Sequence, residues 1–245
     1  MQTHQDLNTS ALARGIGLTF LVGIIVGIVT AVFVSTGIDI NTSADIQATA
    51  ENMMSAETRL HAKAYIGLLG LLLEVIASVG LFLLLCRYGP LLGWTALALS
   101  LVAATLILLG AVSAMNAAEI ASNKAFLAAL NPEAQIALLR VQVTQDYTSF
   151  HLSLLISTLA NAVFFYLFLK SALIPKLIAG WGLFASLFVV TVIILRDFIP
   201  ALGSGTITIA FMVSNLVALV ATGLYLAIKG VRESNAVTYE VLPNR

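Results

Sequence analysis

The chain has 245 residues, of which 60% are hydrophobic and only 10% are charged, and its formal net charge is zero. Soluble domains carry about 25% charged residues, so this composition excludes an ordinary soluble protein and indicates a chain that crosses a membrane several times. Nothing in the charge balance indicates a nucleic-acid partner. The single cysteine, Cys86, excludes an intramolecular disulfide and a cysteine cluster.

Six apolar stretches are long enough to cross a bilayer core, which takes about 20 helical residues. No period-two alternation occurs, so we predict helices rather than barrel strands. We predict one integral membrane domain over residues 1–245, with spans at about 15–36, 62–86, 91–117, 149–170, 176–196 and 207–229 and polar tails at 1–10 and 230–245. The fold class is an all-α polytopic membrane bundle of six transmembrane helices with short extracytoplasmic helical segments.

The first apolar run, residues 16–34, exceeds the roughly 7–15 residues of a signal-peptide core, so we expect it to remain as the first span. Thr9 or Ser10 is a candidate cap for its helix, which Gly37 ends. Gly23 and Gly27 form a pair of small residues four apart, which predicts close packing against a neighbouring helix.

Two polar connections precede the second and fourth spans. In residues 38–61, Ser43 is a candidate N-cap for a short surface helix that carries a weak apolar face. Residues 118–131 form the other polar segment. Asn131 and Pro132 then mark a helix start, and no breaker follows until Pro175. A helix over 132–170 would be about 58 Å long, so we expect it to protrude from the bilayer or to kink.

The distribution of lysine and arginine predicts the orientation, because these residues are enriched on the cytoplasmic side. With both termini cytoplasmic, the inner set is Arg14, Arg87, Lys170, Lys176, Lys229, Arg232 and Arg245. The outer set is smaller and consists of Arg59, Lys63, Lys124, Arg140 and Arg196. We therefore predict six spans with both termini in the cytoplasm.

The second span, within Leu60–Leu85, has one acid in its middle, Glu74. Lys63, Glu74 and Ser78 fall within roughly one 80° stripe of this helix. A carboxylate near the midplane costs about 2.5–3.5 kcal/mol, so it should be neutral, paired or wetted by a cavity. We expect Glu74 to line a polar cavity. The alternative is a protonated Glu74 that only bridges to the next helix.

The fourth span is the most polar, and its polar side chains follow steps of three or four: Asp146, Ser149, Ser153, Ser157 and Asn161. His151 falls near the predicted outer surface. We predict a cavity that opens outward, whose candidate lining residues are Lys63, Glu74, Ser78, Asn116, Glu119, His151, Ser157, Asn161 and Arg196. The alternative is that these groups are structural or simply solvated, because Ser, Asn and His often bond to their own helix or bridge helices.

The sequence lacks the residues that several kinds of catalytic or cofactor site require. The chain has no H-E-x-x-H motif, and none of its three histidines lies deep in the membrane, as a bis-histidine haem requires. We predict no cofactor and no metal, with a site formed by His61, His151 and outer acids as the remaining alternative. The predicted partners are the lipid bilayer, a small-molecule or lipid ligand and a second copy of the chain in a homo-oligomer, and no nucleic acid.

Two stretches resemble a known family. They are TAENMMSAETR at residues 49–59 and LKSALIPKLIAG at residues 169–180. The chain resembles the uncharacterised bacterial multi-pass membrane proteins grouped as domain-of-unknown-function family 4386, although residues 60–63 are more polar than that family leads one to expect. The resemblance implies about six helices in a bacterial inner membrane. It implies no activity and no catalytic residues.

Three functions remain open. The first is binding or transport of a small molecule or lipid, with Glu74, Asn161 and His151 lining the site. The second is a structural or assembly role, for which the small-residue faces of the first span would serve association. The third is an intramembrane enzyme that uses Glu74 or His151 as acid or base. We rank them in this order and lean against an enzyme.

Overall fold

The protein is helical throughout the segments that its computed structural model describes, which are residues 2–43, 45–122 and 130–232, with backbone alone at 2–8, 42 and 43. Its elements are α1 Gln2–Val29, the π-helix η1 Thr30–Val34, α2 Ile40–Ser43, α3 Ile46–Met53, α4 Glu57–Leu85, η2 Cys86–Tyr88, α5 Pro90–Ala121, α6 Pro132–Ser171, α7 Lys176–Leu195, η3 Pro200–Gly203 and α8 Gly205–Lys229. Six of these segments are long and apolar enough to cross a membrane, which confirms the predicted fold class.

The helix ends differ in places from the sequence-based expectation. The first helix begins at Gln2, well before the candidate caps Thr9 and Ser10. Asp45, and not Ser43, caps α3, because its carboxylate accepts the backbone N–H groups of the first turn. Asn131 caps α6 as predicted, accepting from Ala134 N at 2.8 Å. Part of the polar segment 118–131 belongs to α5, and residues 123–129 lie outside the described part of the chain.

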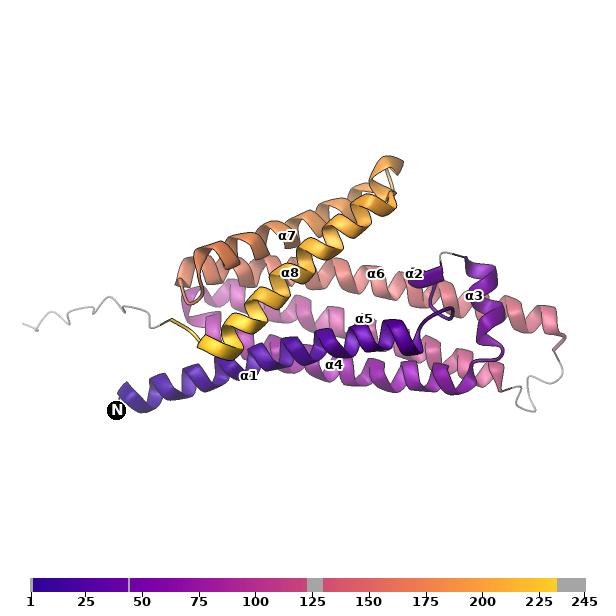
Figure 1. Ribbon diagram of the computed structural model, residues 1–245, viewed down its shortest axis with the longest axis horizontal. Coiled ribbons are helices and arrows are strands. Elements are labelled where there is room, and N and C mark those ends of the chain that lie inside the picture. The colour runs from indigo at the N-terminus through magenta and orange to yellow at the C-terminus, as the bar shows by residue number, and fades with distance from the viewer. Residues whose placement is uncertain (1, 44, 123–129, 233–245) are drawn as a thin grey trace, which may run out of the picture.

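The six long helices form a ring in chain order. Each packs on the one before and the one after it, and α1 closes the ring against α8. Because successive long helices run in opposite directions, α4 and α6 begin at the same end of the bundle, where α7 finishes. We call this the charged end, because Lys63, Asp146 and Arg196 lie there. The helix α6 is one continuous element of 40 residues and reaches past its neighbours at this end (Figure 1).

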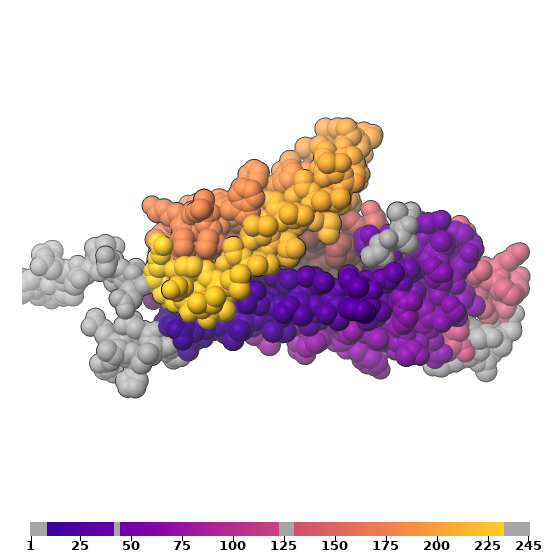
Figure 2. All heavy atoms as spheres, viewed as in Figure 1, coloured from indigo at the N-terminus to yellow at the C-terminus, as the bar shows by residue number. Residues whose placement is uncertain are grey.

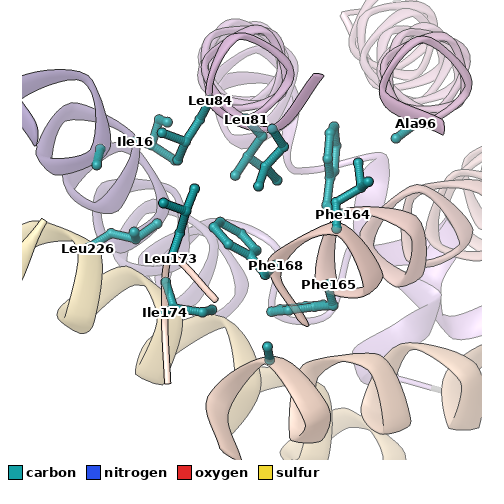
Figure 3. Close-up of a cluster of buried hydrophobic side chains, with 14 of the residues drawn as sticks. Ile16, Leu81, Leu84, Ala96, Phe164, Phe165, Phe168, Leu173, Ile174 and Leu226 are labelled. Carbon is teal, nitrogen blue, oxygen red and sulfur yellow. The ribbon is translucent and has the colours of Figure 1, made fainter. Parts of the chain in front are cut away.

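At the other end of the bundle, one hydrophobic core receives side chains from all six helices. Ile16, Leu84, Phe168 and Leu226 meet there from four of them, together with Leu173 from the short turn before α7 (Figure 3). Phe168 and Leu226 are almost fully buried. Burying a large apolar side chain contributes about 1.5–3 kcal/mol in water, but lipid is as apolar as the core, so close packing is what holds these helices together here.

Toward the charged end this single core divides into two clusters. One joins α3, α4, α5 and α6 around Met53, Leu60 and Leu139. The other joins α6, α7 and α8 around Val192 and Phe211. We call these groups of helices the two arms. They share α6, and the structure thus opens like a V at the charged end, with α8 leaning away from α1 (Figure 1). Figure 2 shows the same separation as a wedge-shaped hollow between these two helices.

The helices α1 and α8 come closest together around Gly17. A Cβ added there would lie 2.6 Å from the backbone oxygen of Gly223 and 2.9 Å from the carbonyl carbon of Leu226. A side chain of any size would therefore push the helices apart. The predicted close packing at Gly23 and Gly27 is wrong, since no atom lies within 4 Å of a Cβ added at either position. The small residues that allow the close contact are Gly17 and Gly223, at the crossing itself.

Candidate functional site

A buried charge cluster ties three elements together at the charged end. Lys63 of α4 donates to Asp39 Oδ2 at 2.7 Å and to Asp146 Oδ2 of α6 at 2.6 Å. The three side chains are 13–16% exposed. We call them the charged triad. Gly110 of α5 makes room for it, because a Cβ at that position would lie 2.9 Å from Asp146 Oδ1. The triad fastens the turn before α2 to the bundle.

The electrostatics at Asp39 favour an ionised carboxylate. Burial alone would raise the pKa of Asp39, but the Lys63 ammonium and the hydrogen bonds from Lys63 and Asn41 outweigh it, and the pKa lies below its ordinary value of 3.8. Two carboxyl groups share the one ammonium of Lys63. Sequence reasoning placed Lys63 among the site residues but assigned no role to Asp39, which only the fold brings next to it.

Arg59 holds the end of the first span in place. Its guanidinium donates to the carbonyl of Val34 at 3.0 Å and 2.8 Å, and also to the carbonyl of Thr36. Val34 is the last residue of the π-helix and Thr36 lies two residues beyond it, and the last carbonyls of a helix have no partner within the helix. Arg59 therefore acts as a C-terminal cap supplied by another helix. Nothing in the sequence pattern indicated this contact.

A pocket of about 530 Å³ lies between the two arms at the charged end, and it has a mixed polar and apolar lining. Its residues are Ile40, Asn41, Ile46, Thr144, Tyr147, His151, Arg196, Gly203 and Thr208. They come from α2, α3 and η3, from α6 and α8, and from the end of α7. We call this the inter-arm pocket. It contains two of the predicted site residues, His151 and Arg196, which the sequence separates by 45 positions but the fold brings to one cavity.

The two ionisable groups of the inter-arm pocket have free hydrogen-bonding positions. His151 Nδ1 lies 2.9 Å from the carbonyl oxygen of Tyr147. A carbonyl only accepts, so Nδ1 carries the proton of the neutral ring and Nε2 is left as an acceptor. Arg196 Nε lies 3.8 Å from Asp197 Oδ1, whose side chain is 77% exposed. Such an exposed pair contributes little, so the guanidinium keeps donors for a ligand.

The predicted buried acid, Glu74, lies deeper in α4. Its carboxyl is hydrogen-bonded to Ser78, one turn further along the same helix. No hydrogen bond joins Glu74 to Asn161, which is half-buried on α6. Ser157 donates to the backbone of its own helix, at Leu154 O. The structure therefore does not pair Glu74 with a polar side chain of the fourth span, α6.

The other predicted site residues lie apart from the inter-arm pocket. Asn116 is exposed on α5, and its Nδ2 lies 3.5 Å from Gln142 Oε1 of α6. Glu119 is half-buried near the end of the same helix. His61 turns toward Met115, with 3.2 Å between Nδ1 and Sδ. Across the described residues, no three His, Cys, Asp or Glu side chains are grouped so as to hold a metal ion.

A second hollow, of about 620 Å³, lies against α5 and α6, and Thr144 lines both this hollow and the inter-arm pocket. Its lining is largely apolar and includes Leu106, Leu109 and Leu152, and its one charged residue is Arg140. By the rotation of about 100° per residue along α6, most of its α6 residues, including Val141, Thr148 and Leu152, face away from the interior of the ring. We interpret the hollow as a groove on the membrane-facing surface that adjoins the inter-arm pocket at Thr144.

These features define the class: the chain is an integral, multi-pass α-helical membrane protein. The family follows from a family model described as "Domain of unknown function (DUF4386)", which matches residues 16–230; the chain belongs to this family. This confirms the resemblance seen in the sequence. Comparisons with curated proteins and with solved structures found no match.

Proposed function

We propose that this protein binds or transports a small molecule or lipid through the inter-arm pocket. In this proposal both termini lie in the cytoplasm of a bacterial cell, so the charged end and its pocket face outward across the inner membrane. The observation that carries the proposal is the pairing of His151 and Arg196 in one cavity. Costly polar groups in a membrane protein mark ligand pathways by default, and ligand pockets combine apolar walls with a few convergent polar groups.

The charged triad supports this proposal as a scaffold. It fixes the turn before α2, and Asn41 in α2 is hydrogen-bonded to Asp39 and also lines the pocket. Arg59 secures the chain a few residues earlier, at Val34 and Thr36. One wall of the pocket is therefore held rigidly, which lowers the entropic cost of binding.

Native mass spectrometry of the protein released from mild detergent tests the proposal. We expect a stoichiometric extra mass on the wild type and its loss in Arg196→Gln. Arg140→Gln is the matched control, because it removes the same charge at the same end of the bundle from a residue that lines the second hollow and does not line the inter-arm pocket. A bare monomer would contradict the proposal, and a bare oligomer would favour the assembly role instead.

A further inference from the structure

We propose that the ligand of the inter-arm pocket is a phospholipid that enters sideways from the bilayer, between α1 and α8. Its phosphate binds at Arg196, and one acyl chain lies in the space between the two arms. This inference rests on the proposed function and adds the ligand class and the route. Four features of the structure lead to it.

The first feature is an open side of the ring. Beyond the crossing at Gly17, no residue of α1 from Leu18 to Val29 is buried. The helix contributes to neither of the two clusters that hold the arms together. Because α8 belongs to the α6–α7 arm, the wedge between α1 and α8 in Figure 2 separates two spanning helices. Such an opening faces lipid tails, not water.

The second feature is an unfilled interior behind this opening. Gly17 faces α8 and Ile16 faces Gly80 of α4. At about 100° per residue, Gly27 lies between these two directions and points into the ring. No atom lies within 4 Å of a Cβ added at Gly27. The interior is therefore not packed at this level.

The facing helices show the same gap. Gly70 of α4 lies on the same face as Lys63, and nothing lies within 4 Å of a Cβ added there. Phe150 of α6 is one turn from Asp146 on the inner face, yet it is 45% exposed. Its ring is in edge contact with His151, at 5.4 Å between centroids. Phe150 thus connects the unfilled interior to the inter-arm pocket.

The third feature is the polarity of the wall formed by α8. Thr208 lines the inter-arm pocket, and Asn215 follows two turns later on the same face. The side-chain oxygen of Asn215 is buried, and none of the described residues donates a hydrogen bond to it. A buried acceptor without a donor costs about 1–3 kcal/mol, so this amide indicates that the face of α8 below the pocket is polar and is not closed by a neighbouring helix.

The fourth feature is the charge of the pocket. Among its nine lining residues, Arg196 alone carries a fixed charge. The planar guanidinium matches the geometry of a phosphate. The hydroxyls of Tyr147 and Thr208 offer further donors for the phosphate, and His151 Nε2 can accept a hydrogen bond from a hydroxyl of the headgroup. The nearest buried acids, in the charged triad, are already engaged by Lys63.

The dimensions fit a lipid. Gly223, at the crossing with α1, lies 15 residues from Thr208, which is about 22 Å along α8. One leaflet of the hydrocarbon core is about 15 Å thick, half of the roughly 30 Å total. A phospholipid whose phosphate lies at the charged end therefore has room for a full acyl chain in the wedge, before the point where α1 and α8 meet.

The test compares two probes and two tryptophan variants by native mass spectrometry. The probes are dioleoylphosphatidylglycerol and its soluble headgroup, glycerol 3-phosphate. Gly27→Trp directs an indole toward the interior from a Cβ position that has no other atom within 4 Å. Gly15→Trp is its control, because the Cβ position of Gly15 is equally unobstructed but lies on the opposite side of α1 from α8. Gel filtration establishes that each variant is folded.

We expect the wild type and Gly15→Trp to retain the lipid. Gly27→Trp and Arg196→Gln should each lose it by about tenfold or more, as expected for a blocked path and for a lost hydrogen bond to a charged group. Glycerol 3-phosphate should bind much more weakly than the lipid.

Other outcomes separate the two proposals. If glycerol 3-phosphate binds as tightly as the lipid, and Gly27→Trp leaves it bound, then the ligand is a soluble phosphate compound; the proposed function stands and the lipid inference fails. Equal retention of the lipid by every variant would place it on the outer surface of the bundle and would also overturn the inference. If neither probe binds the wild type and no other extra mass is present, both proposals fail.

Discussion

Replacement of Lys63 by methionine should destabilise the protein through the two carboxylates left behind. Met keeps the length and apolar stem of the side chain but removes the ammonium that lies 2.7 Å from Asp39 and 2.6 Å from Asp146. Removing one partner of a buried ion pair costs about 3–5 kcal/mol, because the remaining charge is uncompensated. Here two like charges would also face each other across the gap.

Protonation limits this cost and gives it a pH dependence. Neutralising one aspartate at pH 7, from an ordinary pKa near 3.9, costs about 1.4 kcal/mol per pH unit and thus about 4 kcal/mol in all. If the variant folds with one carboxyl protonated, its native state binds a proton that its unfolded state does not. Its stability then rises as the pH falls, and the deficit relative to wild type should shrink by roughly 1.4 kcal/mol per unit between pH 7 and pH 5.

Equilibrium unfolding in mixtures of a mild detergent and SDS, followed by tryptophan fluorescence, measures this deficit. Lys176→Met is the control, since Lys176 is exposed at the start of α7, and a surface change of this kind stays within about 0.5 kcal/mol. The combined variant with Asp39→Asn and Asp146→Asn should recover most of the loss. A deficit below about 1 kcal/mol, or one independent of pH, would refute the assignment of the triad as a coupled buried cluster.

Three further predictions concern single positions. The contribution of Asp39, whose pKa is lowered from 3.8, should be complete above that value and lost as the pH falls through the lower pKa of the folded protein; the difference in unfolding free energy between wild type and Asp39→Asn should therefore be flat near neutrality and shrink in acid, and a constant difference down to pH 2 would contradict it. Gly17→Leu should separate α1 from α8 and cost at least the roughly 1–3 kcal/mol of an overpacked core; an unchanged unfolding midpoint would show that the helices do not meet there. Gly110→Ala should cost about 1–3 kcal/mol by displacing Asp146, while Gly180→Ala, which meets no neighbour within 4 Å, should be neutral; equal effects would argue against a steric cause.

Sequence reasoning recovered what depends on local composition. The six spans and the Asn131 cap needed only hydropathy and capping rules. The same reasoning wrongly predicted close packing at Gly23 and Gly27. A pair of small residues allows another helix to approach closely, but it does not show that one is there. Sequence reasoning also could not identify Asp39 as the partner of Lys63, because 24 residues and a turn separate them.

The sequence by itself determined that the chain is a membrane bundle of six helices with polar groups gathered at one end, because the cost of exposing backbone and charge to lipid leaves few alternatives. Only the tertiary structure decided how those groups are used. The angle at which α8 crosses α1 separates the charged end into two arms, and this separation leaves His151 and Arg196 facing a pocket. That angle follows from the close contact at Gly17 and from the packing of α7 and α8 on α6. Both are long-range contacts that no local pattern encodes.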